Sequence, residues 1–553
     1  MGLSLTGNRF ANRLPLTANR LLLICFILGL VSCNTWLDVT PNNEQVTDDY
    51  WKSKEDVEAV LASGYYYMRQ CTPNYIKWGE LRGGNLYSTS SDDVMLQDFN
   101  LTPSYALCNY ATLYKAISMA NSVLKYAPSV RTVDDTYAEG ILKSHLAEAY
   151  FIRAYNYFIL MKNYKEIPLI TDAYVNDEQT FYVAKSSEED IIRQIKADLN
   201  EAISSNSAKS TYDDDWATKG RATKWALYAL MADVCLWNAQ VNGVDDDFEE
   251  CAMYCNLILD AKTSGETFYP AFMMNTANWY SIFYPGNSNE SIFELNWDYN
   301  QYQETNNFSS LFTISESSRM KFTTRGLEEV KAEISEVLAA DPSLDGRVGR
   351  MLLATCVPSG TEISTWQTSP NLYIWKYRGN DVANLEGLRV NQDANFILYR
   401  VSEIMLMKAE ALVMRGSKGL ADKGESWKAA LALIDQIRQR ARLDDFKGID
   451  PEGEGASQEV MQLDELTLIE EILHQREMEF VAEGKRWYDL LRFGRMQNYA
   501  YEENFKQLVL SGNQTTTPDW IKSVLMDRNA WYLPIPQSEI DVNKLLEQNP
   551  YYE

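Results

Sequence analysis

Hydrophobic residues recur at the spacing of an amphipathic helix in several segments of the chain. Apolar positions fall at i, i+4, i+7 and beyond, so each segment presents one apolar face. The stripes are Ala147/Phe151/Ala154/Phe158/Met161, Trp225/Ala229/Ala232/Leu236/Ala239, Val401/Met405/Ala409/Leu412, Trp427/Leu431/Ile434/Ala441 and Leu466/Ile469/Leu473/Phe480. Weaker patterns predict further helices near 54–69, 110–126, 188–203 and 247–262.

Alanine and large aromatic residues share these apolar faces. Small residues beside large ones allow paired helices to pack closely, as they do in tetratricopeptide-like repeats. The full repeat consensus of about 34 residues is not legible, so the repeats are degenerate. We therefore predict a mainly α fold, with a tetratricopeptide-like helical scaffold over about 110–262 and 397–495.

The helical signal fades between about 263 and 396, where Asn, Ser, Thr, Gly, Tyr and Trp are frequent. Alternation over 291–297 predicts a short strand, and 373–377 is a second candidate. Long irregular insertions on a rigid scaffold commonly carry binding contacts. We expect a loop-rich, ligand-binding insertion here. Further irregular stretches are expected at 71–109 and at the acidic 444–463, followed by a proline-extended tail over 496–553.

The N-terminus has the layout of a secretory signal peptide. Arg9, Arg13 and Arg20 precede the apolar run 21–31, which is too short to span a bilayer. The ending Leu30-Val31-Ser32-Cys33 resembles a bacterial lipobox. We predict that residues 1–32 are removed and that Cys33 is lipidated, tethering the protein to a membrane surface. The alternative is an ordinary cleaved signal that happens to precede a cysteine.

The chain is strongly acidic, with a net charge of −26. Such a polyanion is repelled by phosphate backbones, which argues against nucleic acid as a partner. Two histidines leave little scope for a histidine zinc site or a Ser-His-Asp apparatus. Cys251 and Cys255 lie four residues apart and could bind a metal, but small buried packing residues are the favoured interpretation. We predict no cofactor and no metal.

The chain is rich in aromatic residues, with 14 Trp and 34 Tyr. Trp and Tyr faces suit the flat C–H faces of sugar rings, while Arg, Asn or Asp side chains bind sugar hydroxyls. Two irregular segments, 78–87 and 279–302, supply both kinds of residue, and Gly83-Gly84 would let a ligand approach the backbone. The candidate glycan-binding residues are Trp78, Arg82, Asn85, Trp297 and Tyr302. For any single aromatic residue, core packing is the favoured interpretation.

The order of short motifs along the mature chain resembles the SusD/RagB family of nutrient-binding outer-membrane lipoproteins. The matching segments are 36–41 (Trp-Leu-Asp-Val-Thr-Pro), 113–121, 147–155 with 167–169, 220–224, 476–490 and 533–536 with 539–540 and 548–550. The resemblance implies a single SusD-like domain over 33–553, four tetratricopeptide-like units and a non-catalytic role. It also implies a surface-exposed outer-membrane location and a SusC-like TonB-dependent transporter as partner.

The segment 476–489 gathers Arg476, Glu479, Glu483, Arg486 and Asp489. Two carboxylates could cleave a glycosidic bond, but a buried ion network that locks helices together, with Gly484 ending a helix, is favoured. The runs 213–215 and 245–247, each three aspartates, invite a calcium interpretation. They lack the glycine and glutamate of an EF-hand loop, so solvated loops are favoured.

These features lead to one main hypothesis, a cell-surface glycan-binding lipoprotein that delivers oligo- or polysaccharide to an importer and is not an enzyme. The alternative within binding proteins is capture of peptides or glycopeptides for the same kind of importer, in which case the strong negative charge would select basic peptides. A glycoside hydrolase and a pure protein scaffold are the remaining alternatives.

Overall fold

A computed structural model describes residues 50–174, 179–264, 276–342, 349–357, 364–380, 387–512 and 518–553. The chain divides into two units, Met1–Lys52 and Ser53–Glu553. The predicted signal peptide and Cys33 lie outside the described residues. Everything below concerns the second unit.

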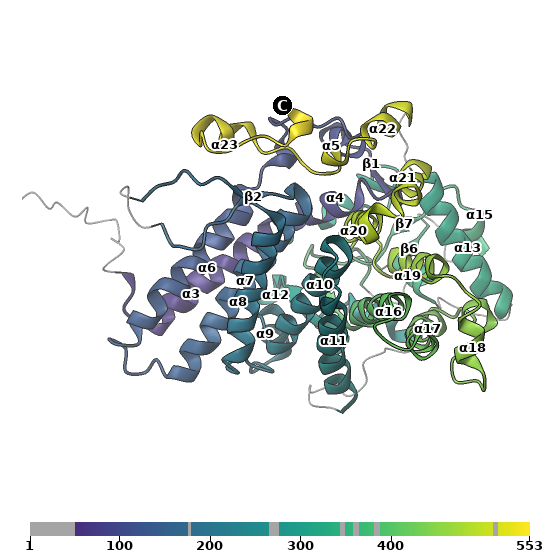
Figure 1. The fold of residues 1–553 in the computed structure, drawn as a ribbon, viewed down its shortest axis with the longest axis horizontal. Helices are drawn as coiled ribbons and strands as arrows, with labels where there is room; N and C mark the ends of the chain where they lie inside the picture. The colour runs from purple at the N-terminus through teal and green to yellow at the C-terminus, as the bar shows by residue number, and fades with distance from the viewer. Residues whose placement is uncertain are drawn as a thin grey trace, which may run out of the picture. The chain divides into compact units, whose positions relative to one another are not determined.

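The Ser53–Glu553 unit is mostly helical, which confirms the predicted fold class (Figure 1). Its long helices are α3 (Lys54–Gln70), α6 (Ala111–Val130), α7 (Glu139–Tyr164), α8 (Glu188–Ser204), α10 (Lys224–Asn242), α11 (Asp246–Ser264), α13 (Thr324–Ala340), α16 (Val401–Ser417), α17 (Lys423–Arg440), α19 (Glu465–Glu479) and α20 (Arg486–Tyr499). None of the helices in the described part of the chain combines the length and apolar character that crossing a bilayer demands.

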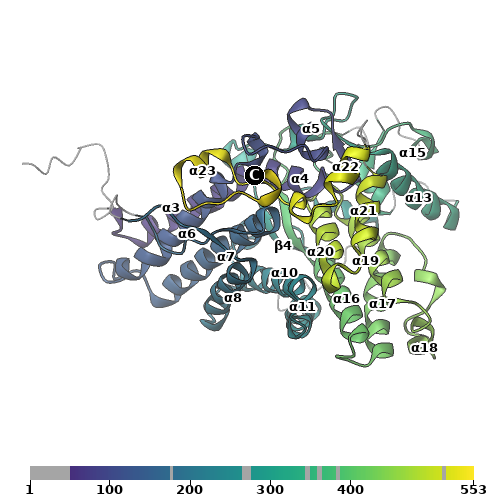
Figure 2. The ribbon, with the colours of Figure 1, turned by 45° about the horizontal axis from the view of Figure 1, so that its top comes forward.

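Successive long helices pack against one another in pairs. Helix α6 packs on α3 and α7, α7 on α8, α10 on α11, and α11 on α16, which packs on α17 (Figure 2). The predicted apolar stripes of α7, α10 and α16 are buried at every position. Alanines at these contacts allow the close helix approach that a tetratricopeptide-like array requires.

Side-chain caps fix where several helices begin. Ser187 Oγ accepts a hydrogen bond from the Asp190 N–H at 3.1 Å, and the Asp464 carboxylate accepts one from Thr467 at 2.7 Å. Ser53 and Asp56 form a reciprocal capping box at the start of α3. Each cap satisfies backbone N–H groups that a helix end leaves without partners.

The strands form four two-stranded antiparallel ladders. They pair as β1 (Leu86–Ser88) with β5 (Met320–Phe322), β2 (Ile167–Pro168) with β3 (Lys185–Ser186), β4 (Ser291–Leu295) with β8 (Phe396–Arg400), and β6 (Thr355–Cys356) with β7 (Tyr373–Ile374). Both predicted strands exist. Strand β4 is buried at all five positions rather than alternately, because its Glu294 is also buried and accepts a hydrogen bond from Asn395.

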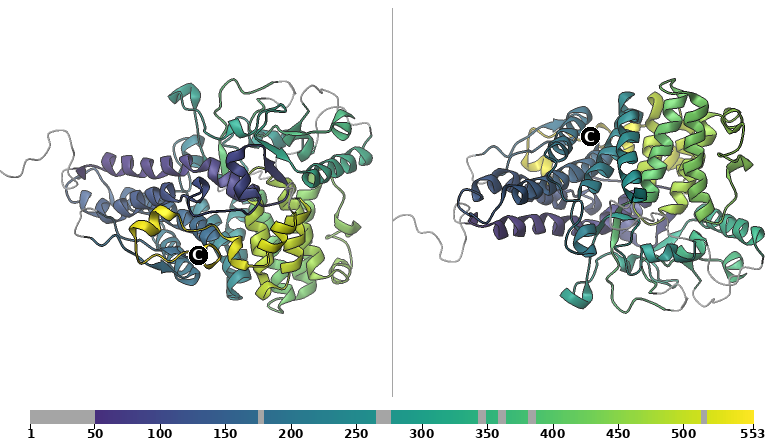
Figure 3. Two further views of the ribbon diagram at one scale, coloured as in Figure 1. Left: turned by 90° about the horizontal axis from the view of Figure 1, so that it is seen from above. Right: turned by 90° about the horizontal axis from the view of Figure 1, so that it is seen from below.

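The loop-rich insertion contains more helix than the sequence pattern predicted. Besides α13, it holds the short helices α12 (Tyr299–Tyr302), α14 (Arg350–Ala354) and α15 (Ser364–Thr368). Val330, Ile334 and Val337 form the buried face of α13. The sequence therefore contains an apolar stripe at helical spacing here, although no helix was predicted from it. In both views of Figure 3 this teal part of the chain lies along one side of the long helices.

The segments predicted to be irregular at 71–109 and extended at 496–553 also contain helices. The first holds α4 (Thr72–Glu80) and α5 (Ser91–Gln97). The second holds α21 (Glu502–Ser511), α22 (Pro518–Val524) and α23 (Gln537–Val542), and the short helix α18 (Ala456–Val460) precedes both α19 and this tail. Residues 533–536 do run extended, and the Leu533 N–H donates to the Asn163 carbonyl at 2.8 Å.

A buried cluster of charges joins the insertion to the C-terminal helices. Its members are four carboxylates and four cations: Glu290, Glu333, Glu479 and Glu483 with Arg350, Lys376, Arg400 and Arg440. All eight residues are buried. We call this set the Arg400 network.

Arg400, the last residue of β8, lies at the centre of the network. Its guanidinium donates to Glu479 and to both oxygens of Glu483, at 3.1 and 3.0 Å for Glu483. Glu290, just before β4, accepts from Arg400 at 3.3 Å and from Arg440. The network therefore holds together the start of β4 and the end of β8, which lie side by side in their antiparallel ladder. The predicted buried ion network is confirmed for Glu479 and Glu483, while Arg476 pairs with Asp489 at 2.8 Å in a separate buried contact. The prediction that Gly484 ends the helix is wrong, because α19 ends at Glu479.

A backbone turn after α19 brings α4 against this region. Gly484 has φ +74°, and a Cβ there would lie 2.6 Å from the Tyr75 carbonyl oxygen. Glu80, at the end of α4, accepts a hydrogen bond from the Gly484 N–H at 2.7 Å. Burial raises the pKa of Glu80 to about 8, outweighing its hydrogen bonds from Gly484 and Asn85.

The Glu479→Gln variant should lose about 3–5 kcal/mol of unfolding free energy, because it leaves buried guanidinium groups without their charge partner. Burial would raise the pKa of Glu479, but Arg440, Arg400 and Arg350 hold it well below its ordinary value. Urea unfolding measures the loss. The matched control is Glu503→Gln, which removes an ion-pair carboxylate that is 78% exposed. Equal unfolding midpoints for the two variants would contradict a structural role for the network.

The Glu80→Gln variant should change the pH dependence of stability. The Glu80 carboxyl has a higher pKa in the folded protein than in the unfolded chain, so it favours the folded state most at a pH below its pKa in the unfolded chain. This contribution is lost as the pH rises toward about 8. The unfolding free energy of Glu80→Gln minus that of the parent should therefore increase between pH 5 and pH 8, by on the order of a few kcal/mol. A difference that is constant across this range would show that Glu80 is ionised when folded.

Candidate functional site

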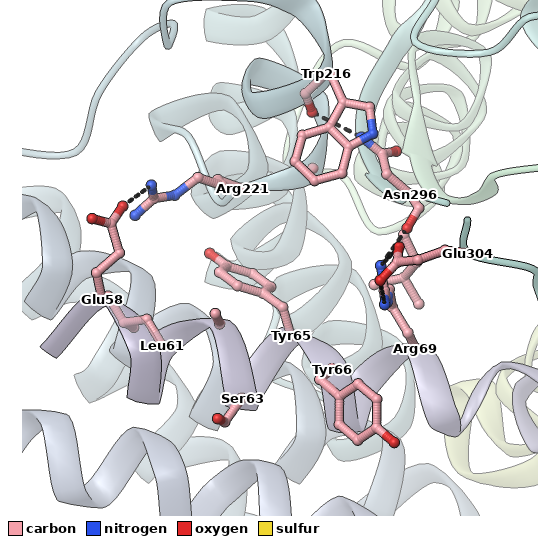
Figure 4. A pocket seen from close by; sticks show the side chains of 13 residues that line it. Glu58, Leu61, Ser63, Tyr65, Tyr66, Arg69, Trp216, Arg221, Asn296 and Glu304 are labelled. Atoms are coloured by element: carbon pink, nitrogen blue, oxygen red, sulfur yellow. Dashed lines mark hydrogen bonds and ion pairs between the residues drawn. The ribbon is translucent and has the colours of Figure 1, made fainter. Parts of the chain in front are cut away.

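An open pocket of about 500 Å³ lies beside helix α3 (Figure 4). Glu58, Leu61, Tyr65 and Arg69 line it from α3, while Met68 on the same helix is buried. The opposite wall comes from α9 (Asp215–Gly220) and from the residues that follow β4.

The aromatic wall is formed by Trp216 on α9. Asp214 caps α9 through the Ala217 N–H at 2.7 Å, and the Trp216 carbonyl accepts from Asn296 at 2.8 Å. Trp216 is 36% exposed. Its ring lies 6.0 Å from the ring of Tyr302, which is 53% exposed, with an interplanar angle of 47°. Trp216 lines the pocket, and Tyr302, which does not line it, contacts Trp216 from outside, so two accessible aromatic side chains meet at its edge.

Two arginines define the polar part of the pocket. Arg69 binds both oxygens of Glu304 at 2.8 Å and donates to the Asn296 carbonyl at 2.9 Å. Arg221 binds both oxygens of Glu148, at 3.0 and 2.9 Å, and one oxygen of Glu58 at 2.7 Å. Bidentate pairs of this kind fix side-chain orientation, so these groups hold their positions before a ligand arrives.

The charges around the pocket shift the pKa of Glu58 and Tyr65. Burial would raise the pKa of Glu58, but the hydrogen bond and charge of Arg221 lower it below the ordinary value. Burial and the adjacent Glu148 raise the pKa of Tyr65 well above its usual range. At neutral pH Glu58 is therefore a carboxylate and Tyr65 a neutral phenol. The pocket can offer stacking faces, hydroxyl groups and carboxylate acceptors.

The structure separates the five predicted glycan-binding residues into two groups. Trp78, Arg82 and Asn85 are buried in the protein interior. Trp78 donates to the Leu107 carbonyl at 2.8 Å, and Arg82 donates to the Trp531 carbonyl at 2.9 Å and lies over the Trp487 ring. Burial in a hydrophobic environment lowers the pKa of Arg82 to about 10. These three residues present no open face.

Gly83 and Gly84 serve packing in the structure. A Cβ on Gly83 would lie 2.5 Å from the Arg486 side chain, and one on Gly84 would lie 2.9 Å from the Leu508 carbonyl. The two glycines therefore allow Arg486 and the Leu508 carbonyl to approach the backbone closely. These groups occupy the space in which a ligand was expected to approach Gly83 and Gly84.

Trp297 and Tyr302 lie close to the pocket. Trp297 is 6% exposed, packs edge-on against Phe308 and lies beneath Arg69, so it supports the pocket wall from inside. Tyr302 is the one member of the predicted set with a largely exposed ring.

Sequence reasoning missed Trp216, Tyr65, Arg69 and Arg221. A usable signal was present for Trp216, which directly follows the run Asp213-Asp214-Asp215. An aromatic residue next to three solvated carboxylates is a poor core candidate. Nothing in the sequence indicated that α3 and the segment after β4, more than 200 residues apart, would share a pocket.

One group of side chains in the described residues could offer three ligands to a metal ion. Cys251 and Cys255 are buried thiols, as predicted, and Cys71, Cys108, Cys235 and Cys356 are buried thiols too. Cys235, Asp247 and Glu250 come within 4.8 Å of one another, but the Lys196 ammonium binds both carboxylates, at 2.7 and 2.6 Å. A lysine charge thus fills the position that a cation would take.

Comparison with known proteins identifies the family. A sequence model described as "SusD family" matches residues 353–552, and one described as "Starch-binding associating with outer membrane" matches 35–236. The chain is 24% identical to SusD-like protein P38 of Formosa agariphila over 85% of this chain and 90% of that protein. It is 22% identical to a SusD-like protein of Bacteroides ovatus over 95% and 96%.

Solved structures show the same fold. A SusD superfamily protein of Bacteroides thetaiotaomicron superposes with a TM-score of 0.67 at 19% identity, covering 91% of this chain and 99% of that one. A structure titled "Laminarin binding SusD-like protein" gives a TM-score of 0.62 at 22% identity, covering 91% and 100%. The chain belongs to the SusD/RagB family, which confirms the resemblance seen in its motifs.

The Trp78→Ala variant should lose about 3–5 kcal/mol of unfolding free energy, because it empties a fully buried site. The Tyr302→Ala variant should change stability by no more than about 0.5 kcal/mol, since its ring is half exposed. Chemical denaturation of both variants tests this assignment. Comparable losses would mean that one of the two environments is not as described.

Proposed function

We propose that the protein is a glycan-binding protein and that the pocket beside α3 is its saccharide site. The observation that carries the proposal is the pair of accessible aromatic faces, Trp216 and Tyr302, at the rim of a pocket with pre-oriented polar groups. Aromatic faces stack on sugar C–H faces, and the carboxylates accept hydrogen bonds from hydroxyl groups. The family description as starch-binding and the neighbour titled as laminarin-binding support the same ligand class.

Capture at this site is reversible binding to a largely preformed surface. Arg69 and Arg221 are held by Glu304 and by Glu148 with Glu58, so little ordering is needed when a sugar binds. The pocket is open, and water competes for each hydroxyl hydrogen bond. These conditions favour modest affinity per site, which suits a protein that must release its ligand to a transporter.

The proposed role includes no bond cleavage. A glycosidase requires a carboxylic acid whose raised pKa keeps it protonated near neutral pH. Arg221 has the opposite effect on Glu58. Glu479 and Glu483, the other carboxylates considered from the sequence, are buried in the Arg400 network and engaged by arginine and lysine.

We further propose that Cys33 carries the lipid anchor, that the protein sits on the cell outer membrane, and that a SusC-like TonB-dependent transporter receives the glycan. The family description "associating with outer membrane" and the signal-peptide layout of residues 1–33 support this. Recovery of the protein from cells with acyl chains on Cys33, together with a co-purifying outer-membrane transporter, tests both parts.

Affinity electrophoresis through neutral polysaccharides tests the saccharide site. Trp216→Ala and Tyr302→Ala should each weaken retention about 5- to 30-fold, since each removes an aromatic contact worth about 1–2 kcal/mol. Tyr182→Ala is the matched control, because Tyr182 is also 53% exposed but, unlike Tyr302, does not lie against the pocket residue Trp216.

Three outcomes would contradict this proposal. Retention that survives both pocket substitutions would place the glycan elsewhere. Release of reducing ends by the purified protein would show that it is an enzyme. Retention of basic peptides in place of every polysaccharide would favour the peptide-capture alternative.

A further inference from the structure

The two pocket arginines are already neutralised by carboxylates. Arg69 forms a bidentate pair with Glu304, and Arg221 forms a bidentate pair with Glu148 and a further bond to Glu58. Sites that recognise carboxylate or sulfate groups need guanidinium or ammonium donors that remain available to the ligand. An anionic sugar would have to displace an existing carboxylate partner to gain such a contact.

Further carboxylates lie next to Trp216 in the sequence. Asp213, Asp214 and Asp215 are exposed and directly precede Trp216. The Glu58 side chain is 51% exposed and uses one oxygen for Arg221. The exposed Lys209, which helps to lower the pKa of Glu58, is the cation that offsets part of this charge. Three carboxylates, Glu58, Glu148 and Glu304, thus contact the two pocket arginines, within a chain of net charge −26.

We propose that this pocket selects uncharged saccharides and rejects saccharides that carry carboxylate or sulfate groups. The inference rests on the proposed saccharide-binding function and adds the charge class of its ligand. Neutral hydroxyl groups can donate to Glu58 and Glu304, while an anionic group meets repulsion from the same oxygens. A single like charge within about 6 Å of Glu58 at a solvent-exposed site weakens binding on the order of tenfold.

Matched pairs of glycans test the proposal. Laminarin, amylopectin and glucomannan are each compared with their C6-oxidised form, in which the primary alcohol at C6 has been oxidised to a carboxylate. Dissociation constants for the purified protein are measured at low salt and in 1 M NaCl, where the Debye length falls to about 3 Å. We expect the neutral form of each bound glycan to bind on the order of tenfold tighter at low salt, with a smaller ratio in 1 M NaCl.

Charge variants assign the effect to the pocket. Glu58→Gln keeps an oxygen that can accept from Arg221 but removes the negative charge, so the ratio between neutral and oxidised glycan should fall. The double variant Glu58→Gln/Glu304→Gln should lower the ratio further. Glu55→Gln, on the same helix but outside the pocket with a side chain that is 68% exposed, should leave the ratio unchanged.

The possible outcomes separate the inference from the function on which it rests. Oxidised glycans that bind as tightly as neutral ones, or a ratio that neither salt nor Glu58→Gln alters, overturn the charge selectivity while leaving saccharide binding intact. Failure of every neutral and oxidised glycan to bind overturns the proposed function and the selectivity together.

Discussion

The buried ion cluster around Arg400 is the constraint on which the rest of the structure depends. Four carboxylates and four cations lie away from water, and each charge is tolerated because opposite charges contact it directly. Removing charges from water costs free energy, so such a cluster specifies geometry more than it adds stability. Here it forces the end of β8, the segment before β4, α17 and the end of α19 to meet in one arrangement.

The paired strands β4 and β8 connect this buried cluster to the pocket. Strand β4 begins next to Glu290 in the cluster and ends at Leu295. Of the residues that follow, Asn296 lines the pocket, Trp297 supports its wall, and α12 carries Tyr302. Helices α3 and α9 supply the remaining wall. The helical array thus holds a pocket at its surface without placing the buried charges within reach of a ligand. Rigid support and an open aromatic rim are what a protein needs to hold a saccharide and release it unchanged.

Much of the scaffold was predictable from sequence, because its long helices bury alanine and aromatic stripes at clear helical spacing, as in α7 and α10. Short elements such as α4, α12 and β5 were not, since they are too short to show a period and form through tertiary contacts. The pocket was only partly predictable. The sequence alone does not distinguish Trp78 from Trp216. Tertiary packing buries Trp78 in the core and leaves Trp216 accessible to solvent. Arg69 and Glu304 meet only because α3 and the segment after β4 are brought together by the fold.

A crystal structure of the protein with a bound neutral oligosaccharide tests the central claim most directly. The account predicts an intact sugar chain with one ring against Trp216 or Tyr302 and with hydroxyl groups near Glu58 or Glu304. A cleaved oligosaccharide, or an intact one bound on another surface while this pocket holds only solvent, would contradict it.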